Sequence, residues 1–435
     1  MGIEKREIIK LLKENTFNTI GCTEVISIIL AVSASHDAVG GKASTINLKL
    51  DKNLFKNAFS VIIPGTRESG LKLAAALGLT INDWRKGLLI LEDINELMLS
   101  QAKGLLDGLD INIDLNYDTN SIYVEAEVIT DNGIGFCLIE HKHDNIVILK
   151  KNSEYLIDEQ NRIDKFYSLN NINYEPDIMR LLETINSLDF KDLAFIEKGI
   201  NINMQAARLG ISEKAGLGLG YQYSKLINDG IIENNIINRA KMYVAGAADA
   251  RMGGVKTSIV GCFGSGNHGI TLFIPLNVMA EGLGSSRETL LKSIAFAEIL
   301  TALVKKVTGL VTSHCGDILA TGVGIAGGTS YLKGAEAPVI ENSLQILIAN
   351  YYGIICDGAK PTCALKIATA VQAGLESALL AGGVHGFQQQ GVIGKNFFET
   401  LNNLEFLIKE EKGASDYHMI RLLEKRNSEN SEMIK

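Results

Sequence analysis

Apolar residues near the start of the chain recur at the spacing of helices. In residues 3–15 (IEKREIIKLLKEN) the isoleucine and leucine positions fall near one face of a helix, which predicts an amphipathic helix there. A second helix is predicted to begin near residues 21–24 and to continue through VISIILAVSA. Because that stretch contains almost no polar residues, we expect it to be buried.

A different pattern follows the second helix, with short β-rich or alternating runs separated by clusters of Asn, Asp and Gly. Such runs are typical of strands joined by turns, and their succession predicts an antiparallel sheet. The runs are ASTINLKL at 43–50, FSVII at 59–63, INIDLNY at 111–117, SIYVEAEVI at 121–129 and NIVIL at 145–149. Between about 150 and 190 the chain is rich in Asn and charged residues, which indicates a surface excursion or a domain junction.

The second half of the chain is almost wholly compatible with helices. Its Ala-, Leu- and Ile-rich segments are interrupted by glycine-rich loops such as GLGLG, GCFGSGNHG, GVGIAGG and AGGVHG. The predicted fold class is therefore α+β. A mixed α/β domain with an antiparallel sheet (1–190) is expected to precede a mainly α-helical domain (191–435).

Composition and charge narrow the class of function. The 435 residues are 46% hydrophobic and carry 42 Lys+Arg against 50 Asp+Glu, a formal net charge of −8, as in an ordered globular protein. No long basic run is present, so we expect a small-molecule substrate and no nucleic acid. The N-terminus has charges where an export signal needs an apolar run. The most apolar stretches, 269–280 and 339–356, are short or interrupted, which predicts a soluble, cytoplasmic protein without a membrane span.

The six cysteines are too few for a disulfide scaffold in a chain of this length, so their positions matter for chemistry. Cys315, Cys356 and Cys363 fall in glycine-containing loops of the predicted helical domain, and none of the six belongs to a C-x-x-C motif. Loop placement favours metal binding or catalysis, whereas burial as small apolar side chains is the alternative. Cys137 fits that alternative, and Cys262 is ambiguous.

Cys22 lies at the expected first turn of the buried helix, beside Gly21 and Thr23. The helix dipole and free backbone N–H groups favour a thiolate there, so we expect a lowered pKa. Such a group can act as a base, a nucleophile or a metal ligand, and a simple buried cysteine is an equally open interpretation. The run from Gly261 to Gly269 also precedes an apolar helix, where backbone N–H groups can bind an anion or a carboxylate.

Five motifs, taken in order along nearly the whole chain, carry a family resemblance. They are GCTE at 21–24, IPGT at 63–66, ARMGG at 250–254, GSGNHG at 264–269 and CDGAKPTCALK at 356–366. Together they resemble the iron-sulfur L-cysteine desulfidase family, which is related to the α-chain of bacterial iron-sulfur L-serine dehydratases. Val25 stands where the family usually has Pro, and His268 where many members have Gln. No cysteine follows Cys363, whereas the serine dehydratases have a C-terminal cysteine that reaches the site.

The resemblance implies that Cys315, Cys356 and Cys363 hold a 4Fe-4S cluster in the helical domain. One iron is left open as a Lewis acid, and L-cysteine is converted to hydrogen sulfide, ammonia and pyruvate without electron transfer. It also implies catalytic roles for Cys22, as the base or as a displaceable fourth ligand, and for His268. The expected substrate-binding residues are Ser265, Asn267 and His268, followed by Thr66 and Lys360. Arg251 and Lys366 are expected to serve only as structural ion partners.

Two other functions remain open from the sequence. One is L-serine dehydratase activity by the same elimination, with hydroxide as the leaving group. The other is a non-enzymatic iron-sulfur sensor, which the absence of a basic DNA-binding helix disfavours. The glycine-broken apolar helices and the positive mean hydropathy favour a homodimer.

Overall fold

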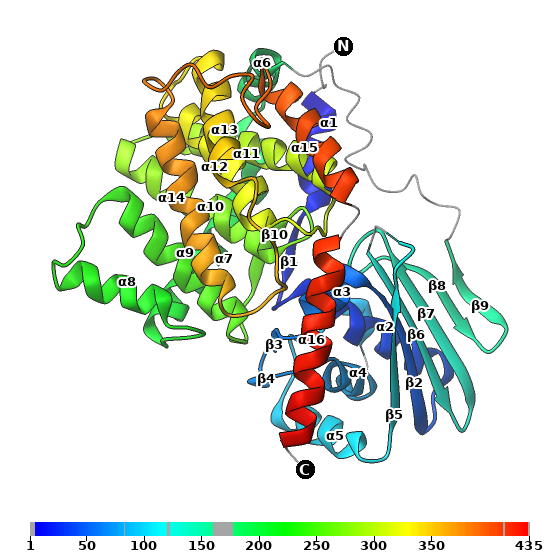
Figure 1. The fold of residues 1–435 in the computed structure, drawn as a ribbon. Helices are drawn as coiled ribbons and strands as arrows, with labels where there is room; N and C mark the ends of the chain where they lie inside the picture. Colours follow the sequence, from blue (N-terminus) through cyan, green and yellow to red (C-terminus); the bar gives the residue numbers. More distant parts are fainter. Residues whose placement is uncertain (1–4, 82, 120–121, 160–176, 412–413, 434–435) are drawn as a thin grey trace.

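A computed structural model describes residues 5–81, 83–119, 122–159, 177–411 and 414–433, the last eight of these as backbone only. Figure 1 shows a part built around a β-sheet beside a larger part built of packed helices, which confirms the α+β class. Part of the Asn-rich excursion expected between 150 and 190 lies outside the described residues. The division of the chain into domains at residue 190 stays a prediction.

The main sheet has six strands in the order β5-β2-β6-β7-β8-β9. It is mixed rather than antiparallel as expected, because β5 pairs parallel to β2 while every other pair is antiparallel. The strands are β2 (Ala43–Asp51), β5 (Asp110–Asn116), β6 (Tyr123–Thr130), β7 (Gly133–Glu140), β8 (Ile146–Lys151) and β9 (Glu154–Asp158). The run FSVII contributes only β3 (Ile62–Ile63), which pairs with β4 (Glu68–Ser69).

The apolar helix expected after residue 21 is α2 (Thr23–Val39), and it is buried along nearly its whole length. It packs against β6, β7 and β8 on one side and against α4 (Leu71–Thr80) on the other, which explains why it has no polar face. The remaining helical elements around the sheet are α3 (Lys52–Ala58), η1 (Trp84–Leu89) and α5 (Glu96–Leu106).

The helical part is centred on α12 (Gly316–Leu332), which contacts four other helices. Its small residues allow these neighbours to approach closely; all of its residues from Ile318 to Ser330 are buried. The contacting helices are α10 (Gly266–Leu283), α11 (Arg287–Thr308), α13 (Ala337–Tyr351) and α14 (Cys363–Leu380). Around them lie α6 (Ile178–Asn186), η4 (Phe190–Leu193), α7 (Ala194–Ser212), α8 (Leu219–Asn228), α9 (Ile236–Met252) and α15 (Phe397–Glu411).

Each end of the chain packs against the part of the molecule that the opposite half of the chain forms. At the start, α1 (Lys5–Asn15) packs against α11, and β1 (Thr16–Thr19) pairs antiparallel with β10 (Ile259–Cys262), a strand in the half expected to be helical. At the end, α16 (Ala414–Met433) lies along the sheet part and contacts α3. The loops that carry the cysteines of interest therefore lie between the two parts, near contacts that both chain ends make.

Among the described residues, α14 is the one helix long and apolar enough to cross a membrane by length and composition, and 61% of it is buried inside the protein. It lies outside the two apolar stretches weighed from the sequence. Core helices of soluble proteins pass the same test, and α14 packs against α9 and α12 as such a helix does.

Candidate active site at four helix N-termini

A hollow lies where four helices begin. Its volume is about 640 Å³, including the space at its opening to solvent. Cys22 precedes α2, Ser265 precedes α10, Cys315 precedes α12, and Cys363 is the first residue of α14; all four line the hollow. Helix N-termini carry partial positive charge and free N–H groups. The fold therefore directs several N-termini at one space that suits an anionic group.

Cys315 and Cys356 are held next to each other by backbone hydrogen bonds between their loops. The N–H of Cys315 donates to the carbonyl of Ile354 (2.8 Å), and the N–H of Cys356 donates to the carbonyl of Ser313 (2.7 Å). These two bonds flank a β-bridge between His314 and Ile355. Two segments that are about 40 residues apart in sequence thus present their thiols to the same hollow.

Cys363 is placed by the turn DGAKPT that connects it to Cys356. Its N–H donates to the carbonyl of Lys360 (2.9 Å), and its Sγ lies 3.8 Å from the carbonyl oxygen of Gly358. Gly358 has a φ of +93°, and a Cβ there would lie 2.5 Å from the carbonyl oxygen of Lys56. Only glycine fits such a turn, which explains the glycine between the two cysteines.

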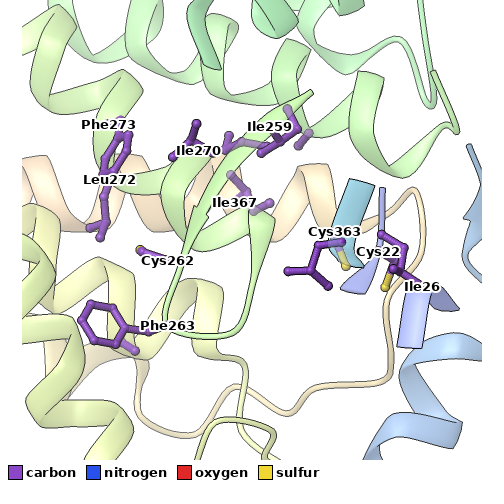
Figure 2. Packing of buried hydrophobic residues seen from close by; sticks show 14 of the residues in the cluster. Cys22, Ile26, Ile259, Cys262, Phe263, Ile270, Leu272, Phe273, Cys363 and Ile367 are labelled. Carbon is purple, nitrogen blue, oxygen red and sulfur yellow. The ribbon is translucent and has the colours of Figure 1, made fainter. Parts of the chain in front are cut away.

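Cys22 has the position expected from the sequence but not the expected electrostatics. Its thiol donates to Oε2 of Glu24 at 2.9 Å. Burial, and then the charge of Glu24, raises the pKa of Cys22 well above its ordinary value, so the expected lowering by the helix start is wrong. In Figure 2, Cys22 and Cys363 lie on the same side of the view, while Cys262 lies apart, between Leu272 and Phe263.

Burial favours the protonated form of two of the three loop thiols as well. Burial raises the pKa of Cys363 to about 12 and that of Cys315 well above its ordinary value. A bound metal reverses this preference, because binding replaces the thiol proton. Lys366 lines the hollow, and its Nζ lies 2.7 Å from Asp357, so it is an ion partner as expected.

The GSGNHG run forms a polar wall at the start of α10. Ser265 caps the helix by accepting from the N–H of Asn267, whose side chain donates to Asp317 (3.2 Å) and accepts from Arg251 (2.7 Å). His268 is buried, with Nδ1 3.2 Å from the carbonyl oxygens of Cys262 and Phe263.

These carbonyls can only accept, so Nδ1 of His268 carries the proton and Nε2 has a free lone pair. Burial, followed by the positive charge of Lys305, lowers the pKa of His268 to about 3. The imidazole is therefore neutral at physiological pH, and Nε2 lies 3.7 Å from Oδ1 of Asp317.

Two expected substrate-binding residues do not line the hollow. The hydroxyl of Thr66 hydrogen-bonds to backbone groups of Ile63 and Glu68, and so shapes the turn between β3 and β4. Lys360 lies 2.6 Å from Asp357 within the cysteine turn. Both residues are placed to support loops rather than to meet a ligand in this hollow.

Four charged residues line the hollow that were not predicted to be catalytic or substrate-binding groups: Glu24, Arg251, Lys305 and Asp317. Arg251 was expected to be an ion partner, yet within the described ranges no carboxylate lies within ion-pair distance of it. For Lys305 the available signal was a lysine between apolar positions of a helix, which is unusual on a buried face. Glu24 is the last residue of the GCTE motif, two positions after Cys22.

The donor set has the chemistry of an iron-sulfur site, because three cysteines line one hollow. Across the part of the chain that the structure describes, no three His, Cys, Asp or Glu side chains are grouped closely enough to hold one metal ion. Cys315, Cys356 and Cys363 all line the hollow. Thiolates are the usual ligands of iron-sulfur clusters, and the converging helix N-termini balance an anionic group.

Comparisons with known proteins match nearly the whole chain. The family model described as serine dehydratase alpha chain matches residues 85–420, a range that includes the three loop cysteines but not Cys22. A UPF0597 protein of Clostridioides difficile (strain 630) is 30% identical over 423 residues, covering 96% of this chain and 99% of the relative. UPF0597 proteins of Clostridium botulinum (strain Hall) and Desulfatibacillum aliphaticivorans are 34% identical (92% of this chain, 94% of the relative) and 33% identical (93% and 94%).

Proposed function

The chain belongs to the serine dehydratase alpha chain family, and from this membership we propose that it is a lyase that cleaves L-cysteine to hydrogen sulfide, ammonia and pyruvate. The observation that carries the proposal is the placement of three loop cysteines around one hollow, beside Cys22 at the start of α2. A structural role as separate buried residues does not account for that convergence.

Cys315, Cys356 and Cys363 are the residues that would hold a 4Fe-4S cluster. When bound, such a cluster supplies an iron without a protein ligand, which acts as a Lewis acid toward the leaving group. Lys366, paired with Asp357, lies on the same side of the hollow and contributes positive charge near the thiolates.

Cys22 is the proposed base for the α-proton of the substrate. Its thiol donates to Oε2 of Glu24 at 2.9 Å and keeps its proton at rest, so the thiolate would form only where metal binding replaces that proton. Burial alone would raise the pKa of Glu24, but nearby His143 and the hydrogen bonds that Glu24 accepts outweigh it and lower the pKa. The carboxylate is thus ionised and orients the Cys22 sulfur through a charge-assisted hydrogen bond.

Loss of the α-proton and of hydrosulfide leaves aminoacrylate, which tautomerises and hydrolyses to pyruvate and ammonia. His268 is the proposed acceptor for the substrate ammonium group, because its neutral Nε2 has a lone pair beside Asp317. Ser265 and Asn267 hold the start of α10 in place and present the backbone N–H groups of that helix.

L-Serine dehydratase activity is the second candidate, favoured by the description of the matching family model. The same residues would act on it, with hydroxide leaving in place of hydrosulfide. Hydrosulfide is the weaker base and the better leaving group, so the two reactions place different demands on the Lewis acid. Pyruvate formation from each amino acid under the same conditions distinguishes the two.

The test is to measure iron, acid-labile sulfide and pyruvate formation on protein purified and reconstituted without oxygen. We expect about four iron and four sulfide per chain, the content of one cluster, and a sharp fall in both for Cys356→Ser. Cys137→Ser is the matched control, since Cys137 is wholly buried in β7 and does not line the hollow. Native protein without iron, or iron that persists in Cys356→Ser, contradicts the proposed centre.

A further inference from the structure

Two cationic side chains line the hollow without an anionic partner. Arg251 is 2% exposed; its Nη1 donates to Asn267 and meets the sulfur of Met252, while its buried Nε has no hydrogen-bond partner. Lys305 is also 2% exposed, and no acceptor or carboxylate within bonding distance of its Nζ is found among the described residues. Burying an unpaired charge is costly, so such a pair is expected only where an anion completes the site.

Glycines at the first positions of α10 and α12 make room for these two cations. A Cβ at Gly266 would lie 2.4 Å from Nε of Arg251, and a Cβ at Gly316 would lie 3.1 Å from Nζ of Lys305 and 2.9 Å from Nε2 of His268. Any side chain at either glycine would occupy the space in which the cation meets the helix N-terminus. The two cations and the two helix N-termini thus face the same hollow.

The acidic residues of the hollow have other partners. Glu24 accepts from Cys22, Thr23 and Asn57, and Asp317 accepts from Asn267. Neither lies within ion-pair distance of the two cations in the described part of the chain. The positive charges therefore remain available to a ligand.

We propose that Arg251 and Lys305, together with the N-termini of α10 and α12, bind the α-carboxylate of the substrate. This inference rests on the proposed function and narrows the substrate class to amino acids with a free carboxylate, excluding their amides, esters and peptides. Carboxylates prefer charge-assisted hydrogen bonds from Arg and Lys, and helix N-termini add to them.

The probe is L-alanine, which keeps the ammonium and carboxylate groups but has no leaving group; L-alaninamide lacks the carboxylate charge. Both are titrated calorimetrically, without oxygen, into protein that has been purified and reconstituted as above, and the iron content of each sample is measured beside the affinity. We expect L-alanine to bind at least tenfold more tightly than the amide. In Lys305→Met and Arg251→Gln the affinity for L-alanine falls about tenfold or more, because a charged hydrogen bond is lost, while the affinity for the amide changes little.

Lys241→Met is the matched control, because Lys241 lies on α9 like Arg251 but donates to Gln372 outside the hollow. Lys305→Arg and Arg251→Lys keep the charge and should retain most of the preference for L-alanine, which separates the site from a general loss of folding. Variants that still prefer L-alanine as the native protein does, or native protein that binds neither probe or both equally, overturn the inference. Loss of iron from Lys305→Met also overturns it for that residue, since Lys305 would then serve the cluster.

Failure of the proposed function has a different signature. In that case the native chain holds no iron or forms no pyruvate, yet the preference for L-alanine and its dependence on both cations persist.

Discussion

The protonation of the Cys22 thiol depends on the groups around it as well as on its position at a helix start. The helix N-terminus favours a thiolate, but complete burial and the adjacent Glu24 carboxylate favour the thiol, and these two effects dominate. The hydrogen bond to Glu24 nevertheless gives the thiol proton a nearby acceptor. The thiol is therefore the resting form, and Cys22 can act as a base only after its proton has been displaced, as happens when a thiol binds a metal.

We predict that Cys22→Ala retains iron and labile sulfide but loses at least a hundredfold in pyruvate formation. The reason is that a positioned base contributes roughly 10²- to 10⁴-fold, and alanine removes it without adding bulk. The measurement is turnover of L-cysteine normalised to iron content. Cys137→Ala, a change of equal size inside β7, should leave turnover intact. Unimpaired turnover in Cys22→Ala would refute the role of base, and loss of iron would assign Cys22 to the cluster instead.

At this scale the sequence was informative about some residues and silent about others. Cys315, Cys356 and Cys363 could be selected because loops with glycine are unusual places for structural cysteines, and the structure brings them to one hollow. Lys305 could not be predicted as a site residue, because a single lysine in an apolar helix leaves no local pattern that reveals which residues it will face. Thr66 was selected on its motif, yet its hydroxyl is used within its own turn.

Among the elements, those with strong local patterns were predictable and those defined by distant partners were not. The burial of α2 followed from an apolar sequence without a polar face. The pairing of β1 with β10 joins residues 240 or more positions apart, and β5 runs parallel to β2 through a long connection. Neither pairing leaves a signal in the alternation of the strands themselves, since alternation reports the faces of a strand but not its neighbours.

Helix α11 contains a second unusual residue, Glu298, which is fully buried behind β1 and β10. It accepts from the hydroxyl of Thr16 (3.0 Å) and contacts the thiol of Cys262, while its Oε2 has no partner among the described residues. Burial raises its pKa to about 8. The folded protein therefore keeps this proton up to about pH 8, whereas the unfolded chain releases it near the ordinary value of 4.5.

We predict that the free energy of unfolding depends on pH through Glu298. Its contribution is fully present below about pH 4.5 and is lost as the pH rises toward 8, by roughly 3–5 kcal/mol over that window. Glu298→Gln cannot ionise, so it should remove this slope and be relatively more stable near pH 8. Urea unfolding of both proteins at pH 5.5, 7 and 8 tests this, with Glu288→Gln on the exposed side of α11 as control. Equal slopes for native protein and Glu298→Gln would contradict the prediction.

At the scale of the whole molecule, the chain end is fastened to the sheet part by a buried ion pair. Nζ of Lys56, on α3, lies 2.6 Å from Oδ1 of Asp416 on α16, and both side chains are almost fully buried. Lys56 also donates to the carbonyl of Thr312 (3.4 Å), and its own carbonyl packs against Gly358. The pair thus connects the last helix to two loops that carry cysteines of the proposed site.

We predict that Asp416→Ala lowers the free energy of unfolding by about 3–5 kcal/mol, because it leaves the ammonium of Lys56 buried without a counter-charge. Replacing both partners, as in Lys56→Met with Asp416→Leu, should recover most of this loss, since no buried charge is left over. Glu405→Ala is the matched control, as it breaks an ion pair with the exposed Lys409 and should cost less than about 1 kcal/mol. Urea unfolding measures all three effects.

Because Lys56 also holds Thr312 and Gly358, iron content should fall in Asp416→Ala and not in Glu405→Ala. A destabilised Asp416→Ala protein with full iron content would show that the ion pair secures only the end of the chain and leaves the cysteine loops unaffected.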